Sequence, residues 1–173
     1  MIKSVHVILF VTLMVASMTS TAGFLWYNHS QPTTESKLRP TFSLPDLQGQ
    51  THTSSEWDGK VVIVNFWATW CPPCIRELPT FIKLQERYAE RGIQFVGIAL
   101  DDQQEVQHFV DEMGINYPVL LGNQEVIMVA QRFGNRLGAL PFTAVIDREG
   151  YIKWRHAGEM HEKKAEQIIL SLL

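Results

Sequence analysis

The sequence predicts an α/β fold in which helices flank a central mixed β-sheet. Buried strands are expected at 61–67 and 93–100, because each is a near-continuous run of β-branched and other apolar residues. Apolar residues at helical spacing follow both runs. A late pair of strands is expected at 143–147 and 151–155, joined by a turn. Strand–helix alternation that ends in a hairpin gives a mixed sheet.

The remaining elements complete a folded domain at 41–173. A short strand or hairpin arm is expected at 41–49, where apolar residues alternate before turn-forming residues. The helix after the first buried strand is expected to stop at Gly92, and the helix that begins at 101–102 is expected to stop at Gly114. The other expected elements are a strand at 119–121, a helix at 125–133 and a closing helix at about 161–172.

Length, composition and charge limit the class of protein. The chain has 173 residues, of which 46% are hydrophobic and 19% are charged, and this composition fits one compact globular domain. Fifteen basic and eighteen acidic residues give a net charge of −3. Because a nucleic-acid-binding domain normally carries a basic excess, we expect no nucleic-acid partner.

Residues 1–27 are expected to be a membrane anchor or a signal peptide. No charged residue occurs from 4 to 34, and Lys3 is the only charge before this run, so the N-terminus is expected to stay in the cytoplasm while the rest is exported. An uncleaved anchor would cross the bilayer with about 20 residues. The alternative is a signal peptide that is cleaved before Gly23. A polar linker is expected at 28–40.

The only cysteines, Cys71 and Cys74, lie where the first buried strand gives way to a helix. A disulfide that closes so short a loop adds little stability, so it is expected to serve chemistry. Unpaired N–H groups and the helix dipole lower the pKa of a thiol at a helix N-terminus. Cys71, at the exposed mouth of the helix, is expected to attack a substrate, and Cys74 is expected to resolve the mixed disulfide.

Both residues between the cysteines are prolines. Because Pro72 and Pro73 have no N–H, the Cys71 thiolate relies mainly on the N–H of Cys74. Weaker stabilisation of the thiolate implies a less acidic Cys71 and a more reducing couple. The hypothesis is that this dithiol donates electrons.

Other uses of a cysteine pair fit this sequence less well. A structural zinc site needs four ligands, and only scattered histidines accompany the pair. Attachment of c-type haem needs a histidine directly after the second cysteine, where Ile75 stands. We therefore expect no metal and no cofactor. The alternatives that stay open are two inert thiols and a dithiolate module that handles copper.

Residues 64–74 (Val-Asn-Phe-Trp-Ala-Thr-Trp-Cys-Pro-Pro-Cys) resemble the active-site strand and helix start of the thioredoxin superfamily. More narrowly, they resemble the membrane-anchored TlpA/ResA-like thiol–disulfide oxidoreductases of bacteria. The resemblance covers roughly 41–173, and Pro79 matches the proline that kinks the active-site helix. It implies a thioredoxin-like fold with an N-terminal extension and an inserted strand–helix segment at about 118–133.

The resemblance also implies site residues beyond the cysteines. Leu140-Pro141 matches a cis-proline loop that lies beside the disulfide and guides the substrate, although Phe142 stands where the family usually has Thr. Trp70 is expected to cover the disulfide, whereas Trp67 is expected in the core. The substrate-binding residues expected in all are Trp70, Pro72, Pro73, Leu140 and Pro141.

Glu77 has two interpretations. The resemblance places a functional Glu here, near the buried cysteine, where it would assist proton transfer. Asn65 stands where ordinary thioredoxins have a buried Asp, which suggests that Glu77 takes over its role. The alternative is a solvated acid that the helix dipole favours, at a position that does not belong to the core.

The resemblance implies a periplasm-facing enzyme that acts on protein thiols and disulfides. Reduction of apocytochrome c thiols before haem attachment is the best-known task of the family, and a membrane electron donor of the DsbD or CcdA type is implied. We expect a monomer in the bacterial inner membrane, or a soluble periplasmic protein after cleavage. A peroxiredoxin is a further alternative, but Val64 and Ala68 stand where peroxiredoxins have Pro and Thr or Ser.

Overall fold

The computed structural model describes residues 37–173. The predicted anchor or signal peptide at 1–27 and most of the predicted linker at 28–40 lie outside these residues. Within 37–173, no helix has both the length and the apolar character that crossing a membrane requires.

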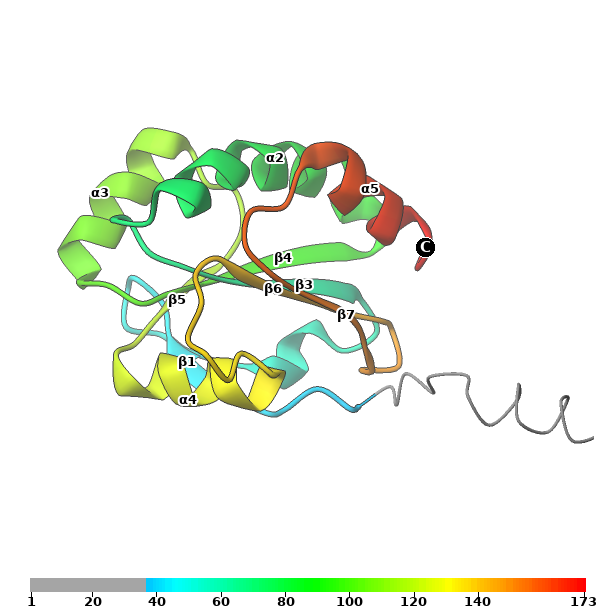
Figure 1. The fold of residues 1–173 in the computed structure, drawn as a ribbon, viewed down its shortest axis with the longest axis horizontal. Coiled ribbons are helices and arrows are strands. Elements are labelled where there is room, and N and C mark those ends of the chain that lie inside the picture. The colour runs from blue at the N-terminus through cyan, green and yellow to red at the C-terminus, as the bar shows by residue number, and fades with distance from the viewer. Residues whose placement is uncertain (1–36) are drawn as a thin grey trace, which may run out of the picture. The chain divides into compact units, whose positions relative to one another are not determined.

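The central sheet has five strands in the order β5-β4-β3-β6-β7 (Figure 1). Neighbouring strands run parallel from β5 to β3 and antiparallel from β3 to β7, which confirms the predicted mixed sheet. All seven residues of β3 are buried, because β3 lies at the centre of the sheet and both of its faces are covered. The strands are β3 (Val61–Trp67), β4 (Ile93–Ala99), β5 (Val119–Leu121), β6 (Phe142–Ile146) and β7 (Ile152–Ala157).

Helices cover both faces of this sheet (Figure 1). One face carries α2 (Pro72–Tyr88), α3 (Gln103–Met113) and α5 (Glu162–Leu170), and the other carries α4 (Gln124–Phe133). The odd-numbered apolar residues of β3 pack in the core under α2, and the even-numbered ones pack in the core above α4. Asn65 is the polar exception on the α2 side.

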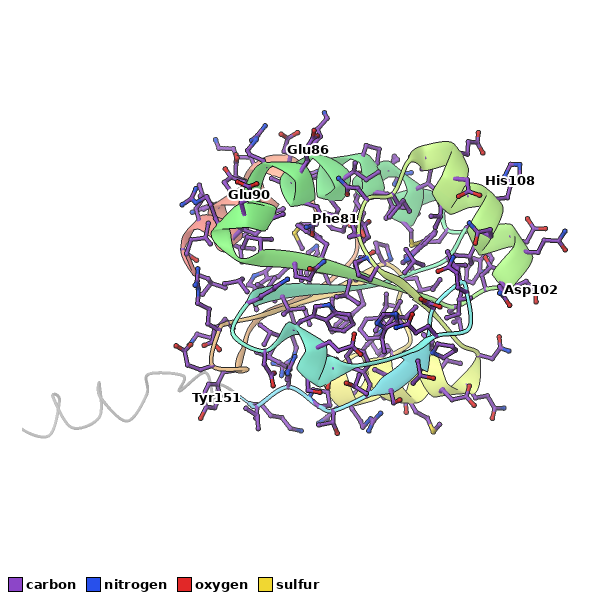
Figure 2. The ribbon with its side chains drawn as sticks, turned by 180° about the vertical axis from the view of Figure 1, so that it is seen from behind. Phe81, Glu86, Glu90, Asp102, His108 and Tyr151 are labelled. Atoms are coloured by element: carbon purple, nitrogen blue, oxygen red, sulfur yellow. A yellow bond between two sulfur atoms is a disulfide. The ribbon has the colours of Figure 1, made fainter. Side chains whose placement is uncertain are left out.

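Glycines end the helices where the sequence predicts. A 3₁₀ turn, η2 (Ala89–Arg91), extends α2 as far as Gly92, which has a φ of 88°, and Gly114 ends α3 with a φ of 65°. Glycine adopts these left-handed conformations without a steric penalty, so a helix stops readily there. Figure 2 shows the two sides of α2, with Phe81 directed at the sheet and Glu86 directed outward, and Glu90 of η2 is directed outward as well.

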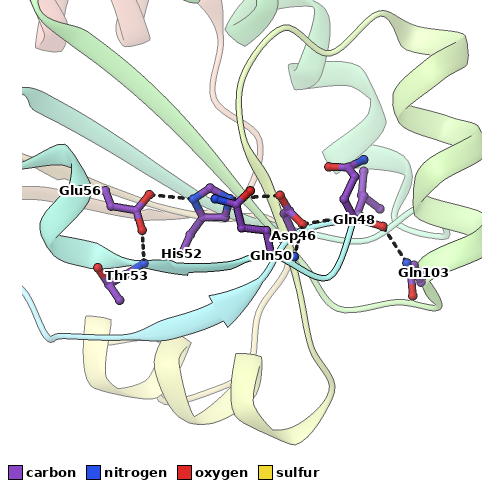
Figure 3. A network of polar contacts seen from close by, with 8 residues as sticks. Asp46, Gln48, Gln50, His52, Thr53, Glu56 and Gln103 are labelled. Carbon is purple, nitrogen blue, oxygen red and sulfur yellow. Dashed lines mark hydrogen bonds and ion pairs between the residues drawn. The ribbon is translucent and has the colours of Figure 1, made fainter.

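The predicted arm is a hairpin of β1 (Ser43–Pro45) and β2 (Thr51–Thr53), followed by the 3₁₀ helix η1 (Ser54–Trp57). His52 bridges two carboxylates, Asp46 at 3.1 Å and Glu56 at 2.7 Å (Figure 3). The Asp46 carboxylate also accepts hydrogen bonds from the N–H groups at 48 and 50, which closes the turn. The arm is therefore a well-connected part of the domain.

The last residues of the predicted linker also belong to the domain. The Lys37 carbonyl accepts a hydrogen bond from the N–H of Ile152 at 2.9 Å, and the N–H of Arg39 donates to Gly150 at 2.8 Å. Arg39 also forms an ion pair with Asp58. These contacts bind residues 37–39 to the turn between β6 and β7, so packing begins before the predicted domain start at residue 41.

Candidate functional site

Cys71 and Cys74 form a disulfide at the start of α2, with their Cα atoms 5.3 Å apart. Cys71 is the N-cap residue, and Pro72 and Pro73 occupy the first two helical positions, where a missing N–H costs no helical hydrogen bond. Cys71 is 4% exposed and Cys74 is fully buried. The expectation that Cys71 is exposed is therefore wrong for the oxidised form, because its sulfur turns inward to join Cys74. Cys74 is nevertheless the more buried sulfur, as predicted.

The turn that precedes the disulfide is held by a carboxylate from the segment that follows β4. Thr69 donates to Asp101 from its N–H at 3.1 Å and from its hydroxyl at 2.5 Å. Trp70, between this turn and Cys71, is 64% exposed, whereas Trp67 is completely buried. The core prediction for Trp67 is confirmed, and the Trp70 ring is available to an approaching partner.

The peptide bond between Leu140 and Pro141 is cis, as the resemblance implies. β6 pairs with β3 through Phe142 and Phe66, so Pro141 comes at the end of β3 that leads to Cys71. The Pro141 carbonyl accepts a hydrogen bond from Gly158 at 2.8 Å. The structure thus brings the cis-proline loop to the same edge of the sheet as the disulfide.

Phe142 and Thr143 divide between the two faces of the sheet. Phe142 packs against Phe66 in the core above α4, and their ring centroids are 6.0 Å apart. Thr143 faces the other side, where its hydroxyl accepts a hydrogen bond from Asn65 at 3.0 Å. The Phe that departs from the family pattern is therefore a core residue, on the face opposite α2.

Glu77 is a buried residue with 1% exposure, so the interpretation as a solvated acid outside the core is wrong. It lies one helical turn after Cys74 and one turn before Phe81, on the side of α2 that packs on the sheet. One carboxylate oxygen, Oε1, accepts a hydrogen bond from Asn65 Nδ2 at 2.8 Å. The other, Oε2, accepts from the N–H of Met160 at 2.8 Å. The first of these bonds places the Glu77 carboxylate beside the Asn65 side chain of β3.

Burial raises the pKa of Glu77 from 4.5 to about 7. The hydrogen bonds from Met160 and Asn65 stabilise the carboxylate and oppose this shift, while the charge of Glu159 adds to it. Glu159 is itself paired with Arg76 of α2 at 2.8 Å. A carboxyl with such a pKa is populated in both protonation states near neutral pH, so it is suited to take up and return a proton.

The chain matches the Redoxin family model over residues 33–169. The chain belongs to the Redoxin family. It is 32% identical over 134 residues to the thiol-disulfide oxidoreductase ResA of Geobacillus kaustophilus, covering 77% of this chain and 75% of that protein. It is 36% identical over 129 residues to ResA of Halalkalibacterium halodurans, covering 74% and 71%.

A solved structure supports the same assignment. The thiol:disulfide interchange protein of the thioredoxin family from Chlorobium tepidum superposes with a TM-score of 0.73 at 31% identity, covering 80% of this chain and 97% of that one. The fold is therefore thioredoxin-like. With the disulfide at the start of α2, this Redoxin family member is a thiol–disulfide oxidoreductase.

Sequence reasoning missed two residues of this site in the Redoxin domain. Met160 bonds to Glu77, and Glu159 bonds to Arg76. In each pair the two residues are 83 positions apart in the chain. Neither Met160 nor Glu159 carries a motif, so no signal in a single sequence could have placed them. The burial of Glu77 did have a signal, since its spacing from Cys74 and Phe81 puts the three on one helical face. Among residues 37–173, no three His, Cys, Asp or Glu side chains are grouped to hold a metal ion.

The raised pKa of Glu77 predicts that the folded domain loses stability as the pH rises. Between the unfolded value of 4.5 and the folded value of about 7, the folded state binds a proton that the unfolded state has released. The loss of folding stability is absent below this pH range and complete above it, where the free energy of unfolding has fallen by about 3 kcal/mol. Urea unfolding of the oxidised protein from about pH 4 to pH 8 should show this fall, and Glu77→Gln should remove it. Identical pH dependence in the two proteins would contradict the prediction.

Proposed function

We propose that this protein reduces disulfides of other proteins on the periplasmic side of a bacterial inner membrane. The observation that carries the proposal is the Cys71–Cys74 disulfide at the N-terminus of α2, at the same sheet edge as the cis-Pro141 bond. The predicted anchor or signal peptide at 1–27, which carries no charge after Lys3, supports an exported domain that is either anchored or released by cleavage. We propose that the domain acts as a monomer.

The proposed reaction moves two electrons from the dithiol to the substrate. The Cys71 thiolate attacks one sulfur of the substrate disulfide, that S–S bond breaks, and one substrate thiolate leaves. The Cys74 thiol passes its proton to Glu77 and attacks the Cys71 sulfur, which releases the second substrate thiolate. The enzyme is then in the disulfide form of this structure. A membrane dithiol donor of the DsbD or CcdA type would restore the dithiol by the reverse exchange.

The proposed substrate class is an exported protein with a pair of cysteines, such as an apocytochrome c before haem attachment. The exposed Trp70 ring and the loop at 140–141 border the disulfide edge and would contact the polypeptide on each side of its cysteine. Pro72 and Pro73 complete the predicted contact set.

Trapping tests this proposal directly. In intact bacteria that express the full chain, Cys74→Ser should remain linked through Cys71 to its substrates, because no resolving thiol is present. Capture of exported proteins that have paired cysteines supports the proposal. A double variant, Cys71→Ser with Cys74→Ser, is the matched control and should capture nothing. Recovery of disulfide-linked copies of this chain alone would contradict it.

The prolines of the active-site turn predict a reducing couple. Equilibration of the wild type with glutathione should give a potential of roughly −200 mV or below, and a value near about −120 mV, that of a strong oxidant, would contradict the prediction. Pro73→Ala restores one N–H at the second helical position. We expect it to lower the pKa of Cys71 and to make the potential less negative. Pro79→Ala, within the same helix, is the control for a general effect of proline loss.

A further inference from the structure

The 158–160 segment, between β7 and α5, binds two parts of the candidate site through its backbone. The N–H of Gly158 donates to the carbonyl of Pro141 at 2.8 Å, and the N–H of Met160 donates to Oε2 of Glu77 at 2.8 Å. The Met160 side chain is 3% exposed and packs in the same core as both cysteines. The segment therefore has a fixed place between the cis-proline loop and the buried side of α2.

Between these two backbone contacts, Glu159 binds the exposed side of α2. Its Oε2 accepts a hydrogen bond from Nε of Arg76 at 2.8 Å and lies 2.7 Å from Nη2 of the same guanidinium. The Arg76 side chain is 58% exposed and that of Glu159 is 22% exposed. Arg76 precedes Glu77 in the chain, and Glu159 precedes Met160. The ion pair and the buried Glu77–Met160 hydrogen bond are therefore adjacent contacts between the same two segments.

The ion pair places two opposite charges next to the buried carboxyl of Glu77. The negative charge of Glu159 favours the protonated form of Glu77, and the positive charge of Arg76 opposes this effect. The β3 contact of Glu77, Asn65, is uncharged. Because the pKa of Glu77 is about 7, even a modest change in the surrounding charge alters the fraction of carboxylate at neutral pH.

Other titratable groups also lie near Glu77 or near the ion pair. Cys74, one turn before Glu77 on α2, is held in the disulfide and does not titrate in the oxidised form. Tyr117, before β5, stays protonated near neutral pH, because burial and the charge of Glu77 raise its pKa. His161, the N-cap residue of α5, has its Nδ1 3.8 Å from Oε1 of Glu159. His161 is therefore the group to remove when the titration of Glu77 is measured.

We propose that Arg76 and Glu159 are positioning residues for proton transfer, and that their opposite charges set the pH at which Glu77 changes its protonation state. This role rests on the proposed function, in which Glu77 takes up the proton of the Cys74 thiol. Loss of the negative charge at position 159 favours the carboxylate of Glu77, whereas loss of the positive charge at position 76 favours its carboxylic acid. Neutral variants at the two positions should therefore act in opposite directions.

Nuclear magnetic resonance of the oxidised protein tests the charge effect without reference to activity. The carboxyl ¹³C signal of Glu77, identified by its loss in Glu77→Gln, reports the midpoint of the titration. We expect Glu159→Gln to lower this midpoint and Arg76→Met to raise it, each by about 0.2–0.7 pH units, as for partly exposed charges. Arg76→Lys keeps the positive charge and should stay close to the wild type. Every protein is titrated with the additional change His161→Gln, so that no imidazole beside Glu159 titrates in the same range.

Lys83→Met and Glu86→Gln are the matched controls, because they remove the same two charges from exposed positions of α2. Both should leave the Glu77 midpoint unchanged. Shifts of Glu159→Gln and Arg76→Met in one common direction would show that a loosened 158–160 segment, rather than charge, acts on Glu77, and would overturn the proposal. Unchanged midpoints in both variants would overturn it as well.

The pH–rate profile of disulfide exchange tests the consequence for catalysis. The step in rate that Glu77 produces should move toward lower pH in Glu159→Gln and toward higher pH in Arg76→Met, by the same shift as the resonance midpoint. A step that stays in place while the midpoint moves would overturn the link to exchange. A wild type without any exchange activity would instead refute the proposed function, while the resonance midpoints would still decide the effect of the ion pair on Glu77.

Discussion

Replacing Cys71 by serine is expected to abolish disulfide exchange down to the uncatalysed rate, because a serine hydroxyl does not ionise near neutral pH and is no nucleophile for sulfur. Replacing Cys74 by serine should have a different result. The remaining Cys71 thiolate can still attack a substrate disulfide, so each enzyme molecule should release one substrate thiol and then stop as the mixed disulfide. Thiol release from a small chromogenic disulfide, supplied in excess over pre-reduced enzyme, measures both results as thiols released per enzyme molecule.

The assignment of these roles depends on the different burial of the two sulfurs. Only Cys71 retains exposed surface, 4% against none for Cys74, and it occupies the N-cap of α2. The positive end of the helix dipole therefore acts on the Cys71 sulfur. A single release of thiol by Cys71→Ser, with none by Cys74→Ser, would reverse the roles. Circular dichroism of both variants controls for folding, since each change removes the disulfide.

Local patterns were sufficient for most of the fold. β3 was predicted with its exact bounds, because a strand at the centre of a sheet is apolar on both faces and reads as an uninterrupted run. Gly92 and Gly114 were correct helix stops because a left-handed cap has a strong residue preference. β7 begins at Ile152 and ends at Ala157, later than predicted, since half of a surface strand is polar and gives weak boundaries.

The site was predictable where its residues lie close in sequence. The cysteines and prolines occupy one helical turn, and a cis-proline was implied by resemblance. The surroundings of Glu77 depend instead on the packing of distant segments, namely the loop with Met160 and the side chain of Asn65. Cys71 was expected to be exposed because it lies at the mouth of the helix, but in the oxidised form it is buried, and of the two interpretations of Glu77 only the one near the buried cysteine fits its burial.

Replacing Glu77 by glutamine should slow disulfide exchange at neutral pH by at least about tenfold and change its pH dependence. The carboxyl has a pKa of about 7, so the wild-type rate should show a step in this region as Glu77 passes from proton donor to proton acceptor. Glutamine has nearly the same shape and no titration, so the step should vanish. The oxygen of the glutamine side chain can still accept a hydrogen bond from either the Met160 N–H or Asn65 Nδ2. Its NH₂ group then faces the other of these two donors and forms no hydrogen bond with it.

The matched control is Glu86→Gln on the outer side of α2 (Figure 2), which makes the same chemical change at an exposed position. It should leave both the rate and the pH profile as in the wild type. Thermal melting separates a kinetic effect from a loss of folding, and above neutral pH Glu77→Gln should melt no lower than the wild type, since it removes a buried charge. Superimposable pH–rate profiles for Glu77→Gln and the wild type would show that the Glu77 carboxyl moves no proton in the exchange, and that its burial serves packing alone.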